Sequence, residues 1–386
     1  MTRAHDIIRI VRDAYGGADG PLPLHAPIFA GNELAYVQAT IESTFVSSVG
    51  AYVDQFERML VEITGAAHVI ATTNGTTALQ MALLLAGVEP GDLVITQSLS
   101  FVATANAIAH ASATPAFVDV EMTTLGMSPD ALRDFFECDC ERVAGGVRHR
   151  ASGRRVAACV PMHAFGFPCR IDEIARLCAQ WRVALVEDAA EALGSWRGAR
   201  HCGTAGLLGT LSFNGNKVCT TGGGGAILTH DALIAKRAKH LTTTAKIPHR
   251  WRFEHNAIGY NFRLPNLNAA LGCAQLEQLD AFLAFKRALA QRYCSAFDSA
   301  GIRFLVEPPD TRANYWLCAL LLDDEAERDA CLDITNDAGV MTRPVWEPLH
   351  SLPMFAQSPC GPLTVTHDVS RRLINIPSGV RAMEPT

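Results

Sequence analysis

The stretch IDEIARLCAQWRVALVEDAA, residues 171–190, decides the class of fold. Its apolar residues first recur at helical spacing on one face, which predicts a helix over 171–182. The following residues form a continuous apolar run over 183–186, which predicts a strand that ends at Glu187 and Asp188. A strand that is apolar throughout is typical of a parallel sheet that is covered by helices on both faces.

The same alternation of short apolar runs with helical patterns extends along the chain in both directions. The pattern predicts strands over 69–72, 93–96, 115–120, 157–161, 208–213 and 226–229, and helices over 76–86 and 104–111. An Arg- and Gly-rich stretch, 145–155, is predicted as an exposed loop. We therefore expect an α/β fold with a mostly parallel central sheet. Ligands of such sheets bind beyond the carboxyl ends of the strands, so a site is expected in the loops that follow strands.

The domain organisation follows from changes in this pattern. Residues 1–25 are predicted as an N-terminal arm, with a short amphipathic helix and a connector rich in glycine and proline. Residues 26–250 carry the α/β pattern and are expected to form a large domain. Residues 251–386 are expected to form a smaller α+β domain, which includes a long connecting helix from Pro265 toward Tyr293.

Composition narrows the class of function. The chain has 386 residues and a formal net charge of −6, with no basic block, which argues against nucleic acid as a partner. No apolar run reaches the ~18 residues of a membrane span, and the N-terminus lacks the apolar core of a signal peptide. The lone CxC at Cys138 and Cys140 makes no zinc motif. We expect a cytoplasmic protein with reduced, buried thiols and no metal site.

Lysine is used sparingly in this chain. Lysine and arginine total 33, and only five of these are lysines. Arginine stays protonated, whereas lysine can lose its proton and attack a carbonyl group. Lys236, Lys239, Lys246 and Lys286 stand in polar or helical contexts and are predicted to be solvated surface residues.

Lys217 stands apart because of its position. It follows the predicted strand 208–213 and precedes four glycines, 222–225, and the strand 226–229. Glycines allow the backbone to approach a ligand closely. From position alone, a ligand-binding lysine and a lysine in a surface hairpin fit equally well.

A reactive lysine of this kind suits pyridoxal 5′-phosphate (PLP), which also needs an anionic partner, a phosphate cradle and a face for its ring. Asp188, at the end of a buried strand, could partner the ring nitrogen, although it also fits a helix cap. Asn74, Gly75 and Thr76 link a strand to a helix, whose N-terminus attracts phosphate. An ordinary N-cap has a similar sequence.

Two further residues complete the pattern. Phe101 follows the strand 93–96 and could stack on the ring, although a lone phenylalanine also fits the core. Ser212, five residues before Lys217, could donate a hydrogen bond to the phosphate. No single residue decides the matter, but this set in this order on one α/β chain predicts a PLP site.

With these residues in place, the sequence resembles the DegT-type sugar aminotransferases, which are PLP enzymes of fold type I. The matching stretches are TNGTTALQMALLLAGVEPGD (73–92), SLSFVATANAI (98–108), VEDAAEALGS (186–195), SFNGNK (212–217), GGGG (222–225) and GYNFRLPN (259–266). The resemblance covers nearly the whole chain. It implies amino transfer from L-glutamate to a nucleotide-linked keto sugar.

The resemblance also implies roles for individual residues. Those that match the cofactor site are Lys217 as the Schiff-base lysine, Asp188 as the ring-nitrogen partner, Gly75, Thr76 and Ser212 at the phosphate, and Phe101 against the ring. Asn261 matches an asparagine that reaches the cofactor phosphate of a neighbouring subunit, which implies a homodimer with shared sites. Glu191 stands where the family usually has glutamine, and its contact is to cofactor or substrate. Lys217 distinguishes the chain from relatives that carry histidine there and act as dehydratases.

Several stretches, including TRPVW (342–346) and FVSSVGAYVDQFE (45–57), are similar to the enzymes of bacillosamine and legionaminic acid biosynthesis. That similarity implies amination at C4 of a UDP-linked 4-keto-6-deoxy-N-acetylhexosamine, for bacterial surface sugars. His163 and Arg343 are the substrate-contact candidates, although a buried structural histidine and an ordinary ion pair fit as well. The alternatives are elimination, C3 amination, a GDP- or dTDP-linked substrate, or a PLP-binding regulatory protein without turnover.

Overall fold

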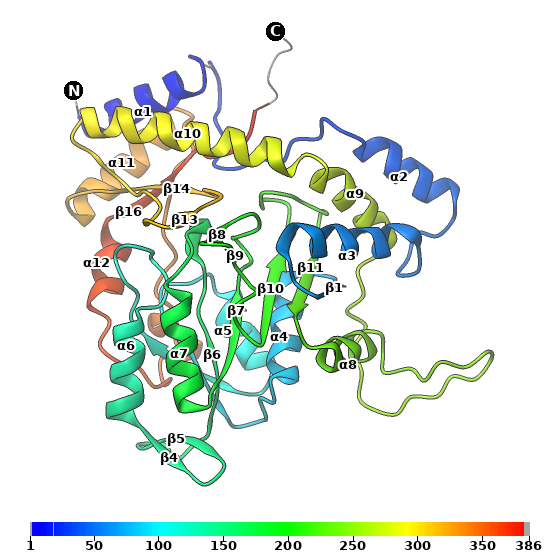
Figure 1. The fold of residues 1–386 in the computed structure, drawn as a ribbon. Coiled ribbons are helices and arrows are strands. Elements are labelled where there is room, and N and C mark those ends of the chain that lie inside the picture. Colours follow the sequence, from blue (N-terminus) through cyan, green and yellow to red (C-terminus); the bar gives the residue numbers. More distant parts are fainter. Residues whose placement is uncertain (1, 18, 382–386) are drawn as a thin grey trace.

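The computed structural model describes residues 2–17 and 19–381. At its centre lies a seven-stranded sheet with the order β1-β11-β10-β7-β6-β2-β3 (Figure 1). Its strands are β1 (His68–Thr72), β2 (Leu93–Gln97), β3 (Thr114–Val118), β6 (Val156–Val160), β7 (Ala184–Asp188), β10 (Leu208–Ser212) and β11 (Gly225–Thr229). All run in one direction except β11, which is antiparallel to β1 and β10. The predicted α/β fold with a mostly parallel sheet is confirmed.

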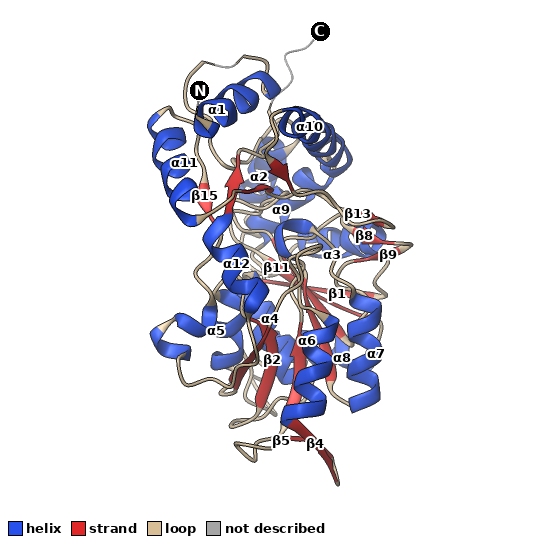
Figure 2. Cartoon of the chain, turned by 90° about the vertical axis from the view of Figure 1, so that its left-hand side faces the viewer, coloured by secondary structure: helices blue, strands red, loops and turns tan. Residues whose placement is uncertain are grey.

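Both faces of this sheet are covered by helices, as the continuous apolar strands require. Side chains alternate between two cores along each strand: in β2, Leu93 and Ile95 face one core and Val94 faces the other. The helices on one face are α4 (Gly75–Leu85), α5 (Ala103–His110) and α8 (Ala232–Thr242), and those on the other are α6 (Pro129–Asp134) and α7 (Ile171–Trp181). Figure 2 shows the sheet from the side, with α5 on one side of β2 and α6 and α7 on the other.

A smaller antiparallel sheet lies in the C-terminal part, in the order β12-β14-β16-β15. Its strands are β12 (Arg303–Phe304), β14 (Cys318–Leu321), β15 (Arg343–Pro344) and β16 (Leu373–Ile376), and its helices are α10 (Leu279–Ser299), α11 (Glu325–Asp337) and α12 (Thr364–Arg372). The N-terminal helix α1 (Arg3–Ala14) packs on α10 and α11, and Leu22 pairs with Val340. The arm predicted over 1–25 is therefore packed against the C-terminal part.

Three further helices lie on the side of the molecule that carries β1. They are α2 (Glu33–Glu42), α3 (Ala51–Thr64) and α9 (Asn266–Leu276), and α9 contacts both of the others (Figure 1). The long helix predicted from Pro265 is two helices, since α9 ends at Leu276 and α10 begins at Leu279, with Glu277 and Gln278 in a turn between them. The stretch 145–155 is not wholly loop either, since β5 (Gly146–His149) pairs with β4 (Cys140–Val143) in a hairpin.

Short elements complete the chain. They are the strands β8 (Trp196–Arg197), β9 (Arg200–His201) and β13 (Thr311–Arg312), and the short helices η1 (Phe135–Asp139), η2 (Ala164–Gly166), η3 (Leu349–Ser351) and η4 (Pro353–Phe355). Within the described residues, no helix is long and apolar enough to cross a membrane. The twelve cysteines are free, and nine of them, including Cys140 of the CxC, are buried.

The prediction that Lys286 is a solvated surface residue is wrong. Lys286 is a residue of α10, and its side chain points into the interior and is only 1% exposed. The Nζ atom donates hydrogen bonds to the carbonyls of Trp316, at 3.2 Å, and Ser378, at 2.5 Å. Burial lowers the pKa of Lys286 to about 7. The neighbouring Arg287 suggested a polar face, but consecutive helical residues point about 100° apart, so one can be buried beside an exposed neighbour.

Candidate active site

A cavity of about 320 Å³ opens at the carboxyl ends of the central strands. It brings together the predicted residues Gly75, Thr76, Phe101, Asp188, Glu191, Ser212 and Lys217. A larger groove of about 1170 Å³ runs along α10, but its ionisable residues are two arginines, which stay protonated. The smaller cavity, with its lysine and two carboxylates, is therefore the candidate active site.

Lys217 lies in the loop that follows β10. Its backbone N–H donates to the carbonyl of Asn214 at 3.0 Å, and the indole Nε1 of Trp316 donates to the carbonyl of Asn216 at 2.6 Å. The Nζ atom lies 3.3 Å from Glu191 Oε1 and 3.9 Å from the centre of the Trp316 ring. The loop is thus tied down on both sides of the lysine, and the amine points into the cavity.

Asp188 is the last residue of β7 and faces the same cavity. Its carboxylate accepts hydrogen bonds from the Thr104 hydroxyl at 2.8 Å and from the Ala190 N–H at 3.1 Å. Burial raises the pKa of Asp188, and these two hydrogen bonds oppose the rise. A buried carboxylate held in this way could keep a ring nitrogen protonated.

Glu191 lies three residues further on and is also buried. Its Oε2 accepts a hydrogen bond from the Phe165 N–H at 2.8 Å, while Oε1 lies near Lys217. Burial raises the pKa of Glu191 to about 7, against the attraction of the Lys217 ammonium. Phe165 has a left-handed backbone, with φ of 56°, so its N–H is held in place by a strained turn.

The first turn of α4 lies at one end of the cavity. Asn74 caps the helix, and its side-chain oxygen accepts the Thr77 N–H at 2.9 Å. The N–H groups of Gly75 and Thr76 belong to the first turn and therefore have no acceptor within the helix itself. A Cβ at position 75 would lie 2.8 Å from Ser212 Cβ and 3.1 Å from Ser212 Oγ. Glycine therefore lets the helix N-terminus and the serine hydroxyl share one small cradle, which fits a phosphate group.

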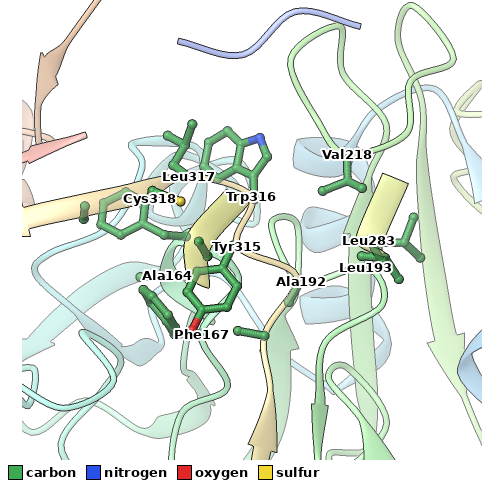
Figure 3. Packing of buried hydrophobic residues seen from close by; sticks show 14 of the residues in the cluster. Ala164, Phe167, Ala192, Leu193, Val218, Leu283, Tyr315, Trp316, Leu317 and Cys318 are labelled. Carbon is green, nitrogen blue, oxygen red and sulfur yellow. The ribbon is translucent and has the colours of Figure 1, made fainter. Parts of the chain in front are cut away.

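Aromatic side chains form the walls. The cavity is lined by Phe101, Trp316 and Trp346. Phe101 is 49% exposed, so it is not a buried core residue, which was the other interpretation of its place in the sequence. Trp346 stacks on Phe165 with ring centres 4.9 Å apart. Tyr315, next to Trp316, packs edge-on against Phe167, and Figure 3 shows this segment among the buried residues beside the site. These walls provide flat faces for a ring.

His163 does not line the cavity. It is fully buried behind Asp188, whose carbonyl accepts the His163 N–H at 3.1 Å. Its Nδ1 accepts the backbone N–H of Cys169 at 3.1 Å, so the ring proton is on Nε2 and is donated to Glu187 at 3.0 Å. This hydrogen bond, with backbone N–H bonds from Gly203 and others, lowers the pKa of Glu187 despite its burial. The structure therefore favours the structural role for His163.

Arg343 and Asn261 also lie outside the cavity. Arg343, on β15, donates to the Asn336 side chain at 2.9 Å and is exposed. Asn261 is exposed as well, and its side-chain oxygen accepts from Arg263. It follows a segment between α8 and α9 that projects from the body of the molecule (Figure 1).

Three of the residues that sequence reasoning missed bear directly on Lys217 and Asp188 or on the cavity wall. Trp316 and Trp346 come from the C-terminal part, far from the motifs in sequence, and Thr104 is a helix residue that binds Asp188. In the sequence, Trp346 belongs to the stretch TRPVW (342–346), which indicates a resemblance but no place in the site. Nothing in the sequence alone places an aromatic from residue 316 against a lysine at 217.

Known proteins place this arrangement in a class. The fold is that of the fold type I PLP-dependent transferases, and the cavity offers the amine, carboxylate, phosphate cradle and aromatic wall that such an enzyme needs. The DegT/DnrJ/EryC1/StrS aminotransferase family matches residues 27–385, and the chain belongs to that family. It is therefore a PLP-dependent sugar aminotransferase, as the sequence predicted.

Individual relatives align over almost their whole length. The GDP-perosamine synthase of Escherichia coli O157:H7 is 34% identical over 357 residues, which are 92% of this chain and 93% of that protein. The GDP-perosamine synthase of Vibrio cholerae is 32% identical over 362 residues, 92% and 94% of the two chains. Among solved structures, the aminotransferase TlmJ from Streptoalloteichus hindustanus is 30% identical with a TM-score of 0.83, covering 93% and 94%.

Proposed function

We propose that this enzyme transfers the amino group of L-glutamate to C4 of a 4-keto-6-deoxy sugar that is linked to a nucleoside diphosphate. Bound PLP supplies an electron-withdrawing ring that takes up an amino group and passes it on. Lys217 holds the cofactor through its amine and, once released, moves a proton as general base and then general acid. Asp188 keeps the ring nitrogen protonated. Gly75, Thr76 and Ser212 hold the phosphate, and Phe101 lies against the ring.

The relatives change the expected nucleotide of the sugar substrate. The sequence stretches around 186–195 and 342–346 suggested a UDP-linked N-acetylhexosamine. Three of the most similar relatives, however, are named for GDP-perosamine, and each aligns over 92% of this chain. We therefore propose a GDP-linked keto sugar as the first candidate acceptor, and a UDP-linked N-acetylated keto sugar as the second.

The charge of the cavity supports a second subunit as part of the site. Its lining contains one cation, Lys217, and two carboxylates, Asp188 and Glu191. Glutamate, the cofactor phosphate and a sugar diphosphate are all anions, so one chain offers little positive charge for them. We propose that Asn261, which is exposed, and the half-buried Arg263, whose side chain donates to Asn261, reach the phosphate of the cofactor in a partner subunit.

Exposed apolar side chains mark the surface on which a partner would pack. Trp251, Phe253 and Ile258 lie in the projecting segment before Asn261, and each is at least 68% exposed. Large apolar side chains that gather at one surface are typical of a protein interface. We propose that this surface is covered in a homodimer.

The decisive experiment is mass spectrometry of the products from ¹⁵N-glutamate and a panel of GDP-, UDP- and dTDP-linked 4-keto-6-deoxy sugars. We expect ¹⁵N in the sugar product, fastest with the GDP-linked substrate, and NMR should place it on C4. A preference for the UDP-linked N-acetylated sugar would support the second candidate. Nitrogen at C3, or loss of the hydroxyl without nitrogen transfer, would contradict the proposal.

A further inference from the structure

The cavity contains more negative than positive charge. Its ionisable lining residues are two carboxylates, Asp188 and Glu191, and one amine, Lys217. Both carboxylates are buried, so each needs a hydrogen-bond donor or a cation to remain ionised. The donors that each receives decide which of the two holds a proton.

Asp188 is satisfied without the lysine. The Thr104 hydroxyl donates to its Oδ2 at 2.8 Å, and the Ala190 N–H donates to its Oδ1 at 3.1 Å. Behind it lies the hydrogen-bonded pair of His163 and Glu187. Both carboxylate oxygens of Asp188 therefore keep a donor whatever happens at Lys217.

Glu191 depends on the lysine. Only its Oε2 accepts a hydrogen bond from elsewhere among the described residues, namely from the Phe165 N–H at 2.8 Å. Its Oε1 faces Lys217 Nζ at 3.3 Å, and this ammonium is the cation that favours its ionised form. The other ionised neighbour is Asp188, whose negative charge acts in the opposite direction.

Binding of the cofactor to Lys217 removes the hydrogen-bond donor that faces Glu191 Oε1. When the Lys217 nitrogen is bonded to the cofactor, it would carry at most one proton, and the ring oxygen beside it would hold that proton, so none would be left to donate to Glu191. The ring hydroxyl oxygen of PLP is attached beside the carbon that bears this link, so covalent structure brings it next to the nitrogen. Glu191 Oε1, which lies 3.3 Å from the nitrogen in the unloaded site, would then be in reach of that electron-rich oxygen. A carboxylate would be repelled there, whereas a carboxylic acid would donate a hydrogen bond.

We propose that Glu191 is a neutral carboxylic acid in the PLP-loaded enzyme and donates a hydrogen bond to the ring hydroxyl oxygen of the cofactor. The two cavity carboxyls then have separate tasks: Asp188 is ionised and holds the ring nitrogen, while Glu191 is protonated and holds the ring oxygen. Similar pairs of carboxyl groups with different environments divide tasks in many enzymes. The raised pKa of Glu191 before loading, at about 7, is in keeping with this division.

Infrared difference spectroscopy tests the proton directly. Adding PLP to the apoenzyme at neutral pH should produce the C=O stretch of a protonated carboxylic acid, which shifts in D₂O. The band should be absent from Glu191→Gln, which replaces the acid by its neutral isostere. Glu33→Gln is a matched control, because Glu33 is also buried but hydrogen-bonds Gln275 and Gln278 and does not line the cavity. This control should keep the band.

Isotope labelling of the wild-type protein keeps the test decisive if the Gln variant does not bind PLP. Incorporation of ¹³C-glutamate should shift the band, whereas ¹³C-aspartate should leave it in place. A second measurement follows the visible absorption of bound PLP from pH 5.5 to 9.5, where wild type should show a transition that Glu191→Gln lacks. No carboxylic acid band on loading, a band that moves with labelled aspartate, or superimposable pH titrations of the two proteins would overturn the proposal. These measurements need only the cofactor, so they stand apart from the choice of sugar.

Discussion

The indole of Trp316 covers the amine of Lys217, with Nζ 3.9 Å from the centre of the ring, and its Nε1 donates to the carbonyl of Asn216 at 2.6 Å. Trp316 thus holds both the side chain and the loop of the lysine, although it comes from the C-terminal part of the chain. The site is therefore assembled where the two parts of the molecule meet.

These two contacts of Trp316 predict that Trp316→Phe lowers stability less than Trp316→Ala does. Trp316→Phe keeps an aromatic face but loses the hydrogen bond to Asn216, and should lower the free energy of unfolding of the apoenzyme by about 1 kcal/mol. Trp316→Ala also leaves a cavity and should lower it by roughly 3–5 kcal/mol, with weaker PLP binding. Urea unfolding and PLP titration measure these effects. Equal stability of Trp316→Phe and wild type would show that the hydrogen bond contributes nothing.

A second prediction concerns Asp188. Asp188→Asn retains the shape and can still accept from Thr104, so the protein should fold and bind PLP. It loses the negative charge proposed to hold the ring nitrogen, and turnover should fall by ~100-fold or more. Steady-state kinetics with a saturating keto sugar measures this loss. Asp92→Asn is the matched control, since Asp92 is also buried but lies just before β2, at the opposite end of the sheet.

Shared sites can be tested by mixing two impaired variants. Lys217→Ala lacks the amine, and Asn261→Ala should bind PLP weakly because the partner's cofactor loses a phosphate ligand. If each site takes Lys217 from one subunit and Asn261 from the other, mixed dimers contain one intact site. Random re-association should therefore restore about a quarter of the wild-type activity. Activity that stays at the sum of the two variants would mean that both residues serve the same chain's site, or neither.

The local parts of the site could be predicted from the sequence because they follow strands. Asp188 ends β7, Gly75 begins α4 after β1, and Lys217 follows β10, so apolar runs and turn residues locate them. The resemblance added the cofactor and the family. Element boundaries mostly agree within one or two residues because the buried strands are short and sharply bounded by polar residues.

Long-range contacts could not be predicted in the same way. Trp316 and Trp346 reach the cavity from the C-terminal part, and no periodicity indicates which buried aromatic meets which strand end. Lys286 stands beside Arg287 on the predicted long helix, a sequence context that is typical of a solvated face. Its acceptors, the carbonyls of Trp316 and Ser378, come from segments that local sequence does not connect.

Lys286 makes a prediction about stability and pH. The pKa of its buried amine is about 7 in the folded protein, below the value of about 10.4 for an unfolded chain. Between these values the unfolded chain binds more protons than the folded one, so the contribution of Lys286 to stability rises with pH. It is fully present above about pH 10 and is lost as pH falls toward 7.

Lys286→Met removes this titration and two hydrogen bonds. The carbonyls of Trp316 and Ser378 would lose a buried donor, which costs about 1–3 kcal/mol for each group. The contribution of Lys286 to the free energy of unfolding rises with pH and is absent from the variant. The difference in free energy of unfolding between wild type and variant should therefore widen from pH 6.5 to pH 9.5. Urea unfolding of the two apoenzymes at several pH values measures it. Lys236→Met, at an exposed position of α8, should follow wild type throughout, and parallel curves for Lys286→Met and wild type would show that the amine does not titrate in this window.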